Sequence, residues 1–271
     1  MKELKAFGGT LIVAVPFQQG LVICADRLGT SGEGETEDTQ KLYQIGPSAA
    51  FAATGITTFR DPRNPNIQYD ACIIIDNFFS EQVFDSNNKR YTELAIRLTT
   101  EFSNFYWRFT NISLPTITVG GIEYPFFFRL IFFYLDQNQI LDVETTDFIQ
   151  HPENKQLALG RIPATEDELK GLTPMVYGDA AVFNEIMNGS DPRFDIVRND
   201  PVIKRFVTGN APAEQVTEEE ALEFAKKLIV ISSQMTPLIT GRQTTIGEVI
   251  DSGILRYGSG FEWKEFNTPI E

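Results

Sequence analysis

Residues 8–26, GGTLIVAVPFQQGLVICAD, and residues 41–54, KLYQIGPSAAFAAT, carry the strongest strand signals in the chain. In the first stretch, two apolar runs at 10–15 and 21–25 flank a five-residue segment that ends in Gly20. β-Branched apolar runs around a short glycine-containing loop predict a β-hairpin. The second stretch has the same organisation around Gly46-Pro47-Ser48, so it predicts a second hairpin.

These strands are apolar on both faces, so both faces of the sheet need cover. Helical periodicity and capping signals predict helices over residues 70–84, 91–109, 178–187 and 217–235. The last of these starts with the capping box Thr217-Glu218-Glu219-Glu220, and Pro237 is expected to end it. Further strands are expected at residues 117–119, 126–135 and 140–143, and as a closing hairpin of 244–250 and 254–257 turning at 251–253. The pattern predicts one α+β domain in which stacked antiparallel sheets lie between helical layers.

Composition narrows the class of protein. The chain has 271 residues, 42% hydrophobic and 12% aromatic, which excludes a wholly disordered chain. Its net charge of −14 argues against nucleic-acid or anionic-membrane partners, because such partners bind proteins with a positive electrostatic potential. The N-terminus lacks an apolar signal-peptide core, and residues 125–135 are too short to cross a bilayer. We therefore expect a cytoplasmic protein.

Metal and thiol chemistry are not expected. Cys24 and Cys72 lie in apolar runs and are predicted to be reduced core residues. The single histidine, His151, lies in a polar stretch, so no Ser-His-Asp triad and no zinc site is predicted. The acidic, glycine-rich segment 29–40 favours a solvated loop over a metal site, because it has no EF-hand register. No metal or cofactor is predicted.

Four short motifs go further. Gly8-Gly9-Thr10 begins the first strand, Ala25-Asp26-Arg27 ends its partner, Lys41 begins the third strand and Thr54-Gly55 ends the fourth. This arrangement resembles the N-terminal-nucleophile (Ntn) hydrolases of the proteasome β-subunit type, including the peptidase of the bacterial two-component ATP-dependent protease. The resemblance is best over residues 8–55 and weaker over 217–253.

The resemblance implies a four-layer αββα sandwich and a threonine-type endopeptidase. Residues 1–9 would be a short leader that the protein removes itself, and residues 10–271 the hydrolase domain. Thr10 matches the nucleophile, and its freed α-amine would act as general base, because such an amine titrates near pH ~8. Asp26 matches the aspartate that orients the lysine, Lys41 the lysine that lowers the pKa of the amine, and Gly55 the oxyanion-hole glycine.

The family also implies partners: peptide or unfolded-protein substrates, a homo-oligomeric ring, and an ATPase that serves the ring. This sequence departs from the family pattern at the glycine turn, where Asp179 stands in place of serine, and after the last long helix, where Pro237 to Gly241 lack the aspartate. Two alternatives therefore stay open. One is a non-catalytic structural subunit that keeps its leader, and the other is an Ntn amidohydrolase acting on small amides.

Overall fold

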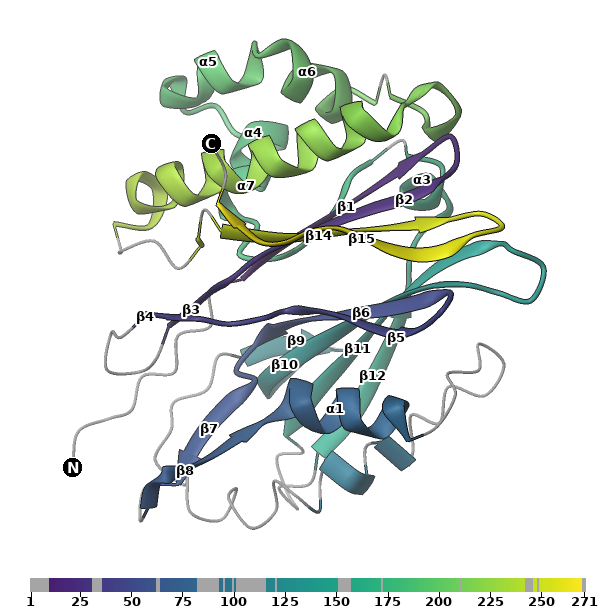
Figure 1. Cartoon of the computed structure of the whole chain (residues 1–271). Helices are drawn as coiled ribbons and strands as arrows, with labels where there is room; N and C mark the ends of the chain where they lie inside the picture. Colours follow the sequence, from purple (N-terminus) through teal and green to yellow (C-terminus); the bar gives the residue numbers. More distant parts are fainter. Residues whose placement is uncertain are drawn as a thin grey trace.

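The computed structural model describes residues 10–30, 36–61, 64–81, 93–94, 96–98, 100, 116–119, 121–150, 157–171, 173–209, 211–241, 246–247 and 249–269. They form an α+β fold of two large antiparallel sheets with helices, as the sequence predicts (Figure 1). Three expectations lie outside these residues: the leader 1–9, the loop residue His151, and most of the helix over 91–109. Residues 31–35 of the acidic segment lie outside them too.

The first sheet has the strand order β13-β1-β2-β14-β15. Its strands are β1 (Leu11–Phe17), β2 (Gly20–Asp26), β13 (Met175–Gly178), β14 (Val249–Arg256) and β15 (Gly260–Pro269). The predicted β1–β2 hairpin is confirmed, with the register Ile12 opposite Ala25. Strands from the middle and the end of the chain flank this hairpin, so distant segments meet at its open end.

The second sheet has the order β12-β11-β10-β6-β5, and β9 pairs with β10. Its strands are β5 (Leu42–Gly46), β6 (Ala49–Gly55), β9 (Thr116–Val119), β10 (Ile122–Leu135), β11 (Leu141–Gln150) and β12 (Leu157–Pro163). The predicted second hairpin is confirmed as β5–β6. Two small hairpins complete the strands: β3 (Leu28–Thr30) with β4 (Thr36–Asp38), and β7 (Thr58–Asp61) with β8 (Asn64–Asp70).

Side-chain alternation divides the core into three apolar clusters. Even-numbered residues of β1, such as Ile12 and Ala14, pack with Ala50 and Ala52 of β6 between the two sheets. Odd-numbered residues of β1, such as Val13, pack against helices on the opposite face. The outer face of the second sheet packs on α1. Both faces of each sheet are therefore covered, which explains why the strands of the first hairpin are apolar throughout.

The longer helices lie on the outer faces of the two sheets, whereas Leu169 of the short α3 packs against the cluster between them (Figure 1). The first sheet carries α7 and its neighbours, and the second carries α1. The helical segments are α1 (Ala71–Ser80), α3 (Glu166–Leu169), α4 (Ala181–Asn188), η1 (Pro192–Phe194), α5 (Asp195–Arg198), α6 (Pro201–Val207), η2 (Ala213–Gln215) and α7 (Glu218–Thr240). No helix in the described part of the chain is long and apolar enough to cross a membrane.

The long helix α7 begins as predicted but ends later. Thr217 and Glu220 form the predicted capping box. Pro237, expected to end the helix, lies inside its last turn, and the helix continues to Thr240. Proline removes an amide donor and crowds the carbonyl four residues earlier, but at this position, close to the end of α7, it does not stop the helix. Gly241 ends the helix in the left-handed conformation at φ 64°.

The prediction of the closing hairpin is wrong about the position of its turn. Residues 251–253, expected to form the turn, lie within β14, which runs without interruption to Arg256. The turn follows Arg256 instead, and β15 pairs back along β14. Asp251 and Ser252 are polar residues typical of a turn, but both are buried here. Tertiary contacts therefore override the local turn signal.

Candidate active site

Asp26 lies at the end of β2, beside the start of β1. Its side chain is fully buried, and its Oδ1 accepts a hydrogen bond of 2.7 Å from the amide of Leu11. The antiparallel hairpin creates this contact, because it sets the first residue of one strand beside the last residue of the other. The carboxylate is thus hydrogen-bonded to the backbone amide of Leu11, immediately after Thr10.

The second oxygen of the same carboxylate has three more donors. The Oδ2 of Asp26 accepts from the Nζ of Lys41 at 2.9 Å and from the amides of Leu28 and Gly247, each at 3.1 Å. These donors come from separate parts of the chain. A buried carboxylate is stable only when such charge-assisted hydrogen bonds compensate its lost hydration. Asp26 therefore connects Lys41, Leu28 and Gly247 through one carboxylate oxygen.

Lys41 is buried against Asp26 just before β5. Its side chain is 7% exposed, and its Nζ also donates to the carbonyl of Leu28 at 2.7 Å. Burial lowers the pKa of Lys41 below its ordinary value, the Asp26 carboxylate opposes this, and the Arg27 guanidinium lowers the pKa further. The ammonium is thus held by fixed partners in a poorly hydrated place, which suits a group that acts electrostatically on a neighbour.

Thr10 lies directly before β1 and is buried, with 4% of its surface exposed. Its carbonyl oxygen accepts a hydrogen bond of 2.8 Å from the amide of Asp179. Gly178 pairs with Leu11 and has φ 95°, and a Cβ added to it would lie 1.9 Å from the Thr10 oxygen. Only glycine allows this approach, so the turn after β13 fixes the backbone of Thr10.

Gly55 ends β6 at φ 103°. A Cβ added here would lie 2.5 Å from the carbonyl oxygen of Phe127, so glycine is required at this position also. The preceding residue, Thr54, is buried, and its Oγ1 lies 3.5 Å from the position of a Cβ on Gly178. The end of β6 therefore reaches the same turn that contacts Thr10.

The four residues expected from the sequence thus come from four strand ends. Direct contacts join Asp26 to Lys41 and to the amide after Thr10. Gly55 is connected to Thr10 through Thr54 and Gly178. The arrangement can hold a hydroxyl-bearing residue at a strand start beside a buried ammonium–carboxylate pair. Such a pair can change the acidity of a neighbouring group.

Sequence reasoning missed part of this site. In the alignment with Ntn hydrolases, Pro237 to Gly241 correspond to a loop that follows the last long helix and supports the nucleophile. In the structure these residues form the last turn of α7 and its cap. The segment that reaches Asp26 is Gly247, six residues further on. Nothing in the sequence marks this glycine. The ion pair of Arg27 and Asp251 was missed as well, although an aspartate inside an apolar strand signals a buried partner.

The cysteines are unsuited to nucleophilic chemistry. Cys24 and Cys72 are both free and buried. Burial raises the pKa of the Cys24 thiol to about 12 and raises the pKa of Cys72 well above its ordinary value. Both thiols therefore stay protonated at neutral pH. The described residues also contain no group of three or more His, Cys, Asp or Glu side chains that could hold a metal ion.

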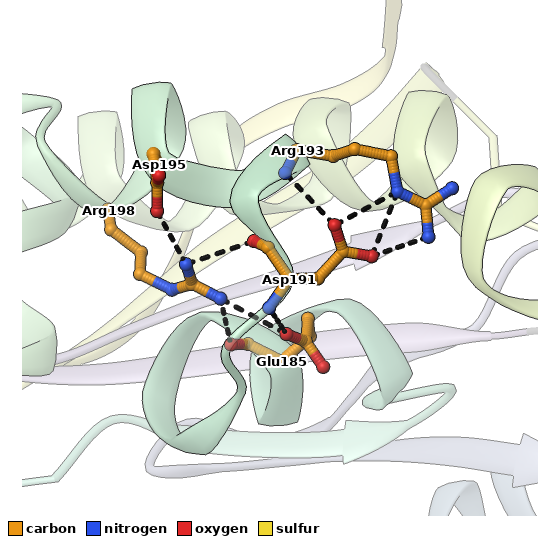
Figure 2. Close-up of polar contacts among 5 residues, drawn as sticks. All are labelled: Glu185, Asp191, Arg193, Asp195 and Arg198. Carbon is orange, nitrogen blue, oxygen red and sulfur yellow. Dashed lines mark hydrogen bonds and ion pairs between the residues drawn. The ribbon is translucent and has the colours of Figure 1, made fainter.

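A second charged cluster lies among α4, η1 and α5 (Figure 2). Arg198 lies 3.1 Å from Glu185 and 2.9 Å from Asp195, and Arg193 pairs with Asp191. Arg193 also donates to the carbonyl of Leu238 in α7 at 3.0 Å. These side chains are partly exposed, and solvent-exposed ion pairs of this kind contribute little to stability. We interpret the cluster as a connection between helices.

No protein-family model matches the chain, and no curated protein sequence matches it.

Proposed function

We propose that this protein is a threonine-type peptidase of the proteasome-like Ntn hydrolase kind, with Thr10 as its nucleophile. In this proposal the two sheets and their outer helices are the αββα sandwich of that family. The single observation that supports it most is the buried Asp26 carboxylate, which accepts hydrogen bonds from both Lys41 and the amide following Thr10. The sequence resemblance assigned roles to these residues, and their contact is what those roles require.

The proposed reaction starts with self-cleavage between Gly9 and Thr10. The Thr10 hydroxyl oxygen attacks the carbonyl carbon of Gly9, its proton passes to the Thr10 nitrogen, and the peptide bond breaks to give an ester with a free α-amine. Water then hydrolyses this ester, which releases residues 1–9 as a carboxylic acid and restores the hydroxyl. The freed α-amine of Thr10 then accepts the proton of its own hydroxyl, and the hydroxyl oxygen attacks the carbonyl carbon of a substrate peptide bond. Lys41 lowers the pKa of that amine by like-charge repulsion, and Asp26 holds Lys41 in place.

The tetrahedral intermediate formed in this way carries a negative oxygen. The backbone amide of Gly55 is proposed to stabilise it. The proton held by the amine then passes to the leaving amine, and the peptide bond breaks to leave an ester on Thr10. Water hydrolyses the ester, releases the second product as a carboxylic acid and restores the hydroxyl.

Intact mass of the protein expressed from Met1 is the first test. Loss of residues 1–9, with Thr10 as the new N-terminus, is expected for the wild type. The Thr10→Ala variant should keep its leader and hydrolyse no peptide, whereas Thr10→Ser, which retains a hydroxyl, should still remove it. A wild-type chain that keeps residues 1–9 and does not cleave peptides would favour the structural-subunit alternative. Cleavage of small amides but not of peptides would favour the amidohydrolase.

A further inference from the structure

Arg27 follows Asp26 in the chain and forms a buried ion pair with Asp251 of β14. Its Nη1 lies 3.0 Å and 2.9 Å from the two carboxylate oxygens, and the two side chains are 9% and 0% exposed. The Phe266 ring of β15 lies 5.1 Å from the guanidinium carbon. Buried ion pairs add little net stability, because desolvation offsets their attraction. Stability alone therefore does not explain the pair.

The backbone of Arg27 joins the two segments that supply partners to Asp26. Its amide donates to the carbonyl of Val249 at 2.9 Å, two residues after Gly247. Its carbonyl accepts from the amide of Thr39 at 2.7 Å, two residues before Lys41. A displacement of Arg27 would therefore move both Gly247 and Lys41 relative to the Asp26 carboxylate.

We propose that Arg27, held by Asp251, is a positioning residue of the candidate active site that acts through Asp26 and Lys41. This inference rests on the proposed function, because it assigns a role within that site. The positive charge of Arg27 acts on Lys41 in addition to the backbone contacts of Arg27. Within the described part of the chain, the charged and titratable groups that change the pKa of Lys41 include Asp26, Arg27 and the Cys72 thiol of α1. Among these three, Arg27 favours loss of the lysine proton, whereas Asp26 and Cys72 oppose it.

Two variants that each remove one charge should shift the pKa of Lys41 in opposite directions. Arg27→Met removes a positive charge near Lys41, so the pKa of Lys41 should rise. Asp251→Asn removes the negative charge that faces Arg27, so the pKa of Lys41 should fall. The conservative Arg27→Lys keeps the charge and should leave this pKa near its wild-type value while reducing kcat, by up to about 100-fold if the site moves by an ångström.

The experiment is an NMR titration of Lys41 in protein labelled at the lysine side chains, with Lys41→Met to assign its signal. It is combined with pH profiles of kcat and KM for peptide hydrolysis. Opposite pKa shifts in Arg27→Met and Asp251→Asn, with parallel movements of the alkaline limb of kcat, are expected. Unchanged Lys41 pKa values in both variants would overturn the inference. Should the single variants unfold, the double variant Arg27→Met/Asp251→Leu removes both charges, and the inference then requires lower kcat with unchanged KM.

These readouts separate the inference from the proposed function. Opposite pKa shifts in a protein without peptidase activity would support the coupling of Arg27 to Lys41 and contradict the proposed function. An active protein whose kcat and Lys41 pKa are insensitive to all the Arg27 and Asp251 variants would retain the proposed function and overturn the positioning role.

Discussion

The Nζ of Lys41 lies 2.9 Å from the Oδ2 of Asp26, and both side chains are buried. Three backbone amides, those of Leu11, Leu28 and Gly247, donate to the same carboxylate. The pair therefore depends on the close approach of four chain segments. Its geometry leads to separate predictions for stability and for activity.

Asp26→Asn should destabilise the protein by about 3–5 kcal/mol, the range for removing one member of a buried ion pair. The amide nitrogen introduced by the substitution is a donor where the carboxylate oxygen accepted, so one or more buried donors would lose their acceptor. Urea denaturation measures the effect. Asp167→Asn, at an exposed position in the first turn of α3, is the control and should change stability by about 1 kcal/mol or less. Equal effects of the two variants would contradict the role given to Asp26.

Lys41→Met should slow peptide hydrolysis by at least ~100-fold, the size typical of losing one electrostatic or acid–base contributor. Removing one member of the buried pair should lower stability by about 3–5 kcal/mol, but the fold should persist, because the three backbone amides still donate to the Asp26 carboxylate. Turnover is measured with a fluorogenic peptide, and circular dichroism checks the fold. Lys170→Met removes an exposed lysine of a surface pair and should leave turnover unchanged. Normal turnover in Lys41→Met would argue against its role in the site.

Gly178→Ala should destabilise the protein by at least about 2 kcal/mol and prevent removal of the leader. The added Cβ would lie 1.9 Å from the Thr10 carbonyl oxygen, and the φ of 95° is unfavourable for alanine. The Thr10 backbone would therefore have to move. Gly258→Ala is a matched control, since its φ is 77° but no atom lies within 4 Å of the added Cβ. It should show only the backbone strain of about 1–2 kcal/mol and normal leader removal, measured by urea denaturation and intact mass.

Stability should fall as the pH rises above 9, partly because of Cys24. Burial raises the pKa of this thiol from 9.0 to about 12, so between these values the unfolded chain loses its proton and the folded chain keeps it. Each pH unit in this window therefore lowers the free energy of unfolding by up to about 1.4 kcal/mol, and the contribution is fully present below pH 9. Urea denaturation at pH 8 and pH 10 should show a smaller loss for Cys24→Ala than for the wild type. Identical losses would indicate that Cys24 ionises in the folded state.

Local signals in the sequence determined the first two hairpins and the start of α7. Runs such as Leu11–Phe17 form strands because β-branched and aromatic side chains suit a covered sheet, and short loops join adjacent strands. Thr217 and Glu220 satisfy free amides within one helical turn, so their effect is independent of the rest of the fold. Asp26 and Lys41 were expected at the candidate site because residues 8–55 resemble the Ntn hydrolases, and the ends of β2 and β5 bring the two side chains into contact.

The segments that complete the candidate site come together through contacts between residues far apart in the sequence. Gly247 reaches Asp26 across 221 residues and Asp251 reaches Arg27 across 224, and no local pattern encodes such contacts. Asp251 and Ser252 are residue types that favour turns, yet both pair with β2, and Ser252 also pairs with β15, so they lie in a buried strand. Pro237 likewise has the local preference to end a helix, but α7 continues past it. Local preferences amount to about 1–3 kcal/mol, and the burial and hydrogen bonding of a whole element outweigh them.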